Sequence, residues 1–284
     1  MPFTLSHAAA VLPAVRGDGS GRGRLVPAAL VAGSFSPDMT YYAAGVLPGA
    51  MRFGNVTHSF AGVLTVDVPV AWALVGLWLL LREPLVALLP RGRQGRWAAL
   101  LRCGAPRARV RPASAAWWYV SAVLGALTHV VWDAFTHHDR WGVRLFPVLA
   151  RSLAGVPLYQ CLQYGSSLVA ALVIAAWVGR AVGRASEGAP AGVALLSVRD
   201  RWCAAAAIGG CSVAAAVQRA VRWWAYRGSD TKPWQLVPTL CFGLGAGLAA
   251  GMLLYAVAVR VWRPARTAAG PGGAGVRRTG SVAR

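Results

Sequence analysis

The chain has 284 residues, of which 56% are hydrophobic and 13% are charged. Soluble domains usually carry about 25% charged residues, so this composition excludes an ordinary soluble domain and indicates an integral membrane protein. The formal net charge is +20 and comes almost entirely from arginine. Because the arginines cluster between apolar runs, as they do beside membrane spans, the charge argues against nucleic acid as a partner.

The first fifty residues are apolar but contain no segment long and unbroken enough to predict a span. Residues 1–15 lack the basic segment that begins a secretory signal peptide, so we expect a short helix capped by Thr4 or Ser6. Residues 26–50 are interrupted by three prolines. They predict one or two short helices that are re-entrant or interfacial.

Five longer apolar runs follow, each near the roughly 20 residues that a helix needs to cross a bilayer. The expected spans cover about 59–81, 115–135, 166–183, 202–220 and 237–262. Asp67 lies inside the first expected span, and Pro69 marks a position for a kink. The sequence therefore predicts an all-α fold, a polytopic transmembrane helical bundle with short apolar helices at its N-terminus.

The distribution of polar residues predicts the organisation and orientation of the bundle. We expect a helical membrane domain that bears the site (1–183), two further transmembrane helices (184–262) and a disordered basic tail (263–284). The connection 82–113 holds eight arginines, and the positive-inside rule places it in the cytoplasm. Counting spans then places the C-terminus in the cytoplasm, and His58 and the stretch 129–137 at extracytoplasmic helix ends.

The most informative residues are a histidine and an aspartate inside the second expected span. His129 and Asp133 are four residues apart, so they share one helix face. Ionisable groups are costly in a membrane and indicate a functional site. His58 stands near the start of the first expected span, and antiparallel neighbours would bring these ends to one membrane face. Imidazole and carboxylate groups bind zinc, or iron or manganese where oxygens are more numerous. The candidate ligands are His7, Asp38, His58, His129, Asp133 and His137.

Several of these residues also have a plainer interpretation. A lone histidine beside a helix end, such as His7, is often solvated, and Asp38 is also a typical helix cap. His58 fits an interfacial position equally well. Asp67 would lie about 13 Å from His58 at 1.5 Å per residue along a helix. We therefore interpret it as a residue that pairs with an arginine or forms hydrogen bonds within the bundle, and not as a metal ligand.

The candidate residues belong to motifs that occur in a fixed order over residues 1 to about 170. They are His7, Ser36-Pro37-Asp38, Thr57-His58-Ser59, His129-x-x-x-Asp133-x-x-Thr136 and Trp141-Gly142-Val143-Arg144-Leu145-Phe146-Pro147. This series resembles the bacterial inner-membrane family described as membrane-bound metal-dependent hydrolases and, more remotely, the helical His/Asp set of zinc-dependent phospholipase C. The opening Pro-Phe-Thr-Leu-Ser-His and the segment Leu158–Ser167 are most similar to an uncharacterised bacterial integral-membrane family of unknown function.

The resemblance implies a multi-pass protein of the bacterial inner membrane that holds a divalent metal, zinc by preference, with membrane lipid as its partner. It implies that His7, Asp38, His58, His129 and Asp133 belong to the metal site. The expected function is hydrolysis of a phosphoester or lipid head group on the extracytoplasmic face, with Asp38 or Asp133 as ligand or general base.

The chain departs from the hydrolase pattern at one motif. Where that pattern has Asp-x-Asp-His, this chain has Asp38-Met39-Thr40-Tyr41. His137, four residues after Asp133, is the candidate replacement. Two alternatives remain open at this point. One is a non-catalytic transporter or assembly factor with a structural metal or a proton relay, and the other is a membrane scaffold without metal. The sequence leaves the oligomeric state open.

Overall fold

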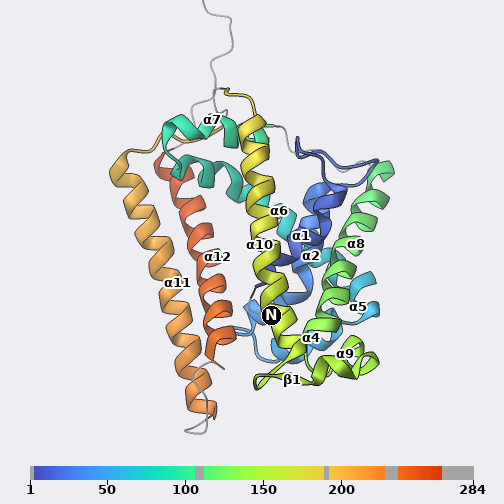
Figure 1. Cartoon of the computed structure of the whole chain (residues 1–284). Coiled ribbons are helices and arrows are strands. Elements are labelled where there is room, and N and C mark those ends of the chain that lie inside the picture. The colour runs from blue at the N-terminus through green and yellow to red at the C-terminus, as the bar shows by residue number, and fades with distance from the viewer. Residues whose placement is uncertain (1–2, 106–111, 189–191, 228–235, 264–284) are drawn as a thin grey trace, which may run out of the picture.

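The computed structural model describes residues 3–105, 112–188, 192–227 and 236–263. Five helices within these ranges are long and apolar enough to cross a membrane, which confirms the all-α fold class and is compatible with a multi-pass membrane protein. They are α6 (Asp67–Leu88), α8 (Pro112–Thr136), α10 (Leu158–Arg184), α11 (Val198–Arg227) and α12 (Leu236–Trp262). Helices suit an apolar phase because every backbone hydrogen bond is made within the segment. Figure 1 shows the five helices running roughly alongside one another.

The N-terminal part of the chain folds as short helices, as predicted. They are η1 (Thr4–His7), α1 (Ala8–Val11), η2 (Leu12–Ala14), α2 (Pro27–Phe35), η3 (Ser36–Asp38), α3 (Met39–Ala43), α4 (Ala50–Thr57) and α5 (Phe60–Leu64). The predicted caps are wrong, because no side chain caps η1. The Thr4 hydroxyl instead donates to Asp38, and the Ser6 hydroxyl donates to the Phe3 carbonyl.

The first long helix begins later than predicted. The expected span 59–81 is broken at Thr65, the residue that follows α5, and α6 begins at Asp67. Pro69 therefore lies in the first turn of α6, where a missing N–H costs no hydrogen bond, and it does not kink the middle of a span. Asp67 lies at the start of the helix and not inside it.

The predicted arginine-rich loop 82–113 is partly helical. α6 continues to Leu88, and α7 (Arg91–Leu100) lies across one end of the bundle (Figure 1). Within this extension of α6, the Arg82 guanidinium pairs with Glu83 at 2.7 Å and donates to the carbonyls of Leu101 and Ala105. These contacts pair the Arg82 charge within the fold. The sequence pattern alone would place this charge in solvent.

The later spans are longer than predicted. α10 begins at Leu158, after the short helices α9 (Trp141–Leu145) and η4 (Pro147–Ala150) and a hairpin of β1 (Ser152–Leu153) and β2 (Val156–Pro157). α11 continues to Arg227 and so includes the first part of the expected link 221–236. In Figure 1, α4, α9 and the hairpin lie at the end of the molecule opposite α7. The predicted basic tail lies outside the described residues apart from Arg263.

Two glycines allow α2 and α8 to pack almost in backbone contact. A Cβ atom on Gly33 would lie 2.3 Å from the Ala122 carbonyl oxygen, and one on Gly125 would lie 2.1 Å from the Leu30 carbonyl oxygen. A small apolar core continues this packing onto α6 through Ala32, Val68, Ala71, Val75 and Ala122. The close approach brings the end of α2 against the last turns of α8, where His129 and Asp133 lie.

Candidate metal centre

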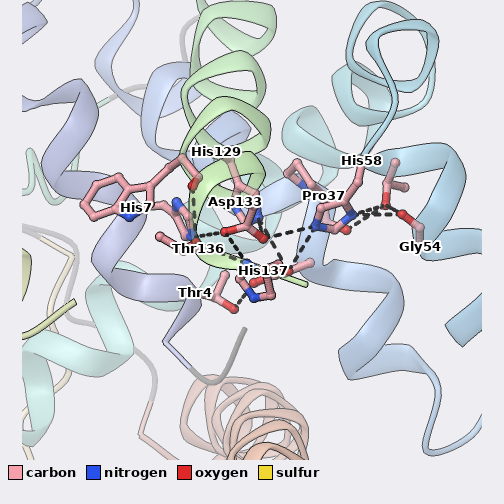
Figure 2. Close-up of polar contacts among 12 residues, drawn as sticks. Thr4, His7, Pro37, Gly54, His58, His129, Asp133, Thr136 and His137 are labelled. Carbon is pink, nitrogen blue, oxygen red and sulfur yellow. Dashed lines mark hydrogen bonds and ion pairs between the residues drawn. The ribbon is translucent and has the colours of Figure 1, made fainter. Parts of the chain in front are cut away.

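The predicted ligand residues gather near the end of the bundle that carries α4 and α9 (Figures 1 and 2). The last two turns of α8 carry His129 and Asp133, and His58 caps the C-terminus of α4. Asp38 ends η3, His7 ends η1, and His137 follows α8 directly. Five of the six are buried, and His137 is partly exposed. Three short helices and the end of one long helix thus converge on a single point.

Four side chains form the compact part of the cluster. One ligand atom from each of Asp38, His58, His129 and Asp133 lies within 4.8 Å of the other three. The His58 Nε2 atom lies 3.6 Å from Asp38 Oδ1 and 3.6 Å from Asp133 Oδ2. The His129 Nε2 atom lies 3.5 Å and 3.4 Å from the same two oxygens. Ligands about 2.0–2.2 Å from a tetrahedral zinc ion are about 3.3–3.6 Å apart, so these four separations fit a tetrahedral cation site.

Two backbone carbonyls set the orientation of the histidine rings. His58 Nδ1 lies 2.8 Å from the Gly54 carbonyl oxygen, and His129 Nδ1 lies 2.7 Å from the Ser34 carbonyl oxygen. A carbonyl only accepts, so each Nδ1 carries the proton and each Nε2 presents a lone pair to the carboxylates. Neither Nε2 atom has a hydrogen-bond partner among the described residues. Lone pairs that face carboxylate oxygens repel them, and a cation between these atoms removes the repulsion.

The Asp38 carboxylate is held by a chain of hydroxyl groups. Thr4 donates to Asp38 Oδ2 at 2.5 Å, and the Tyr42 hydroxyl donates to Thr4 at 3.1 Å. Thr57 donates to the Pro37 carbonyl at 2.7 Å and so fixes the turn that carries Asp38 against α4. These contacts leave Asp38 Oδ1 facing the two histidines. Two carboxylates and two neutral imidazoles carry two negative charges, which a divalent ion would neutralise in this buried place.

His7 and His137 lie beside the other oxygen of Asp133. The Oδ1 atom is 3.4 Å from His7 Nε2 and 3.5 Å from His137 Nδ1. The His7 ring also stacks on the His129 ring, with centroids 3.7 Å apart. Burial lowers the pKa of His7 and lowers the pKa of His137 to about 4, so both rings are neutral at pH 7. Both residues are near the centre but outside the compact set of four.

The segment Leu158–Ser167 supports this arrangement from α10. The Gln163 side-chain nitrogen lies 3.0 Å from His137 Nε2, and Ser166 accepts a hydrogen bond from the Trp132 indole at 3.1 Å. The Ser6 and Ser167 hydroxyl oxygens lie 3.4 Å apart. This motif, which had no assigned role in the sequence, therefore ties α10 to α8 and to the segment that carries His7.

The departure from the Asp-x-Asp-His pattern has a structural counterpart. Tyr41 occupies the position of the histidine, and its ring packs beside the His58 ring with centroids 5.4 Å apart. Thr40, in place of the second aspartate, donates to the Pro37 carbonyl at 3.5 Å. Asp67 is fully buried outside the compact set, and neither of its oxygens has a hydrogen-bond partner among the described residues. The predicted pairing of Asp67 with an arginine does not occur among those residues.

A cavity of about 480 Å³ connects the cluster with the surface. His58 and Asp133 form part of its wall, so two members of the compact set border this space. The other lining residues come from α4, α8 and the segment up to α9: Asn55, Val130, His138, Asp139, Arg140, Trp141 and Arg144. The centre is therefore buried, and the cavity extends to two of its residues.

The fold and the site define a helical protein with five helices able to cross a membrane and a buried His/Asp cluster suited to a metal. Over residues 1–257 the chain matches a family described as a domain of unknown function, DUF4184. The chain belongs to this family, which agrees with the resemblance to an uncharacterised family. No curated protein and no solved structure matches the chain. The likeness to metal-dependent hydrolases and to phospholipase C stays a prediction.

Proposed function

We propose that the protein is a membrane-bound hydrolase that uses a divalent metal, zinc by preference, to cleave a phosphoester or lipid head group. The observation that carries the proposal is the compact set of Asp38, His58, His129 and Asp133, with both Nε2 lone pairs directed toward the carboxylates. Two nitrogens and two oxygens at tetrahedral separations are donors that zinc accepts. Helix α7, part of the arginine-rich connection 82–113, lies at the end of the bundle opposite the cluster, which supports a site on the extracytoplasmic face of a bacterial inner membrane.

The surrounding residues support hydrolytic chemistry. A divalent ion held here would lower the pKa of a bound water and supply a nucleophile near neutral pH. Asp133 is better suited than Asp38 to accept the proton, because its Oδ1 atom has no hydrogen-bond partner among the described residues. The outer oxygen of Asp38 already accepts from Thr4. His137, 3.5 Å from Asp133 Oδ1, would pass the proton toward the partly exposed side.

One observation favours a second candidate function. Four protein ligands complete a tetrahedron, and closed sets of four are typical of structural zinc sites, whereas catalytic sites usually keep one position for water. A non-catalytic transporter or assembly factor with a structural metal, or with a proton relay, would use the same residues. The cavity that reaches His58 and Asp133 argues for the hydrolase, because a purely structural site needs no access.

Metal analysis of detergent-purified protein tests the proposal. We expect about one divalent ion for each chain in the wild type and in His138→Ala, and none in His129→Ala. His138 is the matched control because it is an exposed histidine that pairs with Asp139 outside the compact set. A wild type that binds no metal after reloading would refute the metal site. The metal-loaded protein would then be assayed on phosphodiesters and phospholipids. Bound metal without turnover favours the second candidate, whereas turnover that His129→Ala abolishes supports the hydrolase.

A further inference from the structure

The cavity beside the candidate metal centre carries a positive charge that the fold does not neutralise. Arg140 lines it and is partly buried. Among the described residues, no carboxylate oxygen lies within 4.0 Å of the Arg140 guanidinium. The neighbouring Asp139 carboxylate pairs with His138 instead, at 2.9 Å. The Asp133 carboxylate belongs to the metal set. The neutral Tyr41 hydroxyl lies near Arg140 and leaves the guanidinium charge available.

The turn that carries Arg140 is held in place by Arg144. The Nε and Nη2 atoms of Arg144 donate to the Asp139 carbonyl at 3.0 and 2.5 Å. Asp139 has a φ of 60°, a left-handed conformation that few residues other than glycine adopt. The two hydrogen bonds stabilise this conformation and fix the peptide group that precedes Arg140. An arginine in a fixed turn, facing a cavity and without a counter-ion, is suited to bind an anion.

Two features of the cavity narrow the anion to a phosphate group. One wall presents the metal ligands His58 and Asp133, and another presents Arg140. A tetrahedral phosphate offers oxygens in several directions, so one can face the metal while others meet the guanidinium fork. The volume of about 480 Å³ is also large enough for a phosphate group together with part of its ester. We propose that this cavity binds the phosphate group of a phosphate ester and that Arg140 is the residue that recognises it.

The rim of the cavity favours a lipid as the source of this phosphate. Trp141 lines the cavity and also contacts Phe60 and Phe135, with ring centroids 6.3 and 5.4 Å apart. Phe60 and Trp141 are exposed, as is Phe146, which packs on Phe135. Exposed aromatic rings are typical of the boundary between lipid and water. An ester whose head group enters the cavity could therefore leave its acyl chains beside these rings. This inference rests on the proposed function, because the metal forms one side of the phosphate site.

Phosphate binding by the detergent-purified, metal-loaded protein tests the proposal. Inorganic phosphate would be titrated by calorimetry into the wild type, Arg140→Gln, Arg140→Lys and Arg52→Gln. Arg52 is a matched control, an exposed arginine of α4 outside the cavity lining. We expect Arg140→Gln to weaken binding about ten- to hundredfold, the loss typical of a charged hydrogen-bonding partner, and Arg140→Lys to weaken it less. Arg52→Gln should bind as the wild type does, and all variants should keep their metal.

A second arm compares lipid and soluble sources of the phosphate. The same proteins would be placed in nanodiscs of a phosphate-free glycolipid with and without phosphatidic acid, and inorganic phosphate would compete for the site. Phosphatidic acid that binds through Arg140 supports the lipid source, and Arg140-dependent binding of inorganic phosphate alone supports a soluble ester. Equal binding by the wild type and Arg140→Gln would overturn the proposal. A wild type that holds metal but binds neither probe also overturns it, while the metal site stands. Arg140-dependent phosphate binding by a wild type that takes up no metal after reloading would instead refute only the proposed function.

Discussion

Substitution of Gly125 by alanine tests whether the contact between α2 and α8 holds the metal centre together. The new Cβ atom would lie 2.1 Å from the Leu30 carbonyl oxygen and 2.8 Å from the Ser34 backbone nitrogen. Ordinary contacts of a Cβ atom begin at 3.4 Å, so α2 would have to move away from α8 by about 1.3 Å. Overpacking of this kind typically costs about 1–3 kcal/mol of stability.

The same movement reaches the metal ligands through Ser34. Its carbonyl binds His129 Nδ1 at 2.7 Å, and a shift of this size would stretch that contact to about 4 Å, beyond a hydrogen bond. The ring would then be free to rotate its Nε2 atom away from the carboxylates. Loss of such an outer contact usually lowers metal affinity about 10–100-fold. Gly125→Ala should therefore lower both the unfolding temperature and the metal affinity.

A matched substitution separates this effect from a general effect of alanine. Gly179 lies in α10, where an added Cβ would meet no heavy atom within 4 Å. Gly179→Ala should keep the metal affinity and unfold at the same or a higher temperature, since alanine favours a helix over glycine by about 1 kcal/mol. Thermal unfolding and competition with a metal chelator, in one detergent, measure both quantities. If Gly125→Ala matched the wild type in both assays, the reasoning about the α2–α8 contact would be refuted.

Two further predictions concern the chemistry of the centre. Thr4→Val keeps the shape of a buried side chain but removes the hydroxyl between Asp38 and Tyr42. It should lower metal affinity about 10–100-fold in the chelator assay, and unchanged affinity would mean that Asp38 needs no such support. The histidine ligands must be unprotonated, so protons compete with the metal and metal affinity should fall as the pH decreases. Calorimetry in buffers of different ionisation enthalpy should also detect proton release, and an affinity independent of pH would contradict imidazole ligation.

The fold class and the central pair of ligands could be predicted from the sequence because each depends on a local pattern. Long apolar runs predicted the five helices, and the spacing of His129 and Asp133 placed both on one face of α8. The boundaries were harder to predict. Ser59 caps the N-terminus of α5, and the break at Thr65 and the start at Asp67 fall within a mainly apolar stretch where hydropathy marks neither boundary.

The remaining parts of the site depend on contacts between distant segments. The Ser34 and Gly54 carbonyls that orient the histidines are backbone groups, and no residue type marks them. Arg140 looked like one arginine among many, because its role depends on a cavity made by three segments. Thr4 appeared only as a helix cap, since nothing in a single sequence links it to Asp38. Tertiary packing, and not local preference, decides these positions.

The order of the ligands along the chain has a consequence for how the protein is made. Asp38 and His58 precede α6, whereas His129, Asp133 and His137 lie at the end of α8. The compact set is thus complete once the chain has been synthesised and inserted through α8. None of the six predicted ligand residues lies in α11 or α12. A cation that enters early would join the two halves of the nascent bundle before those last two helices arrive, so metal supply would influence assembly as well as chemistry.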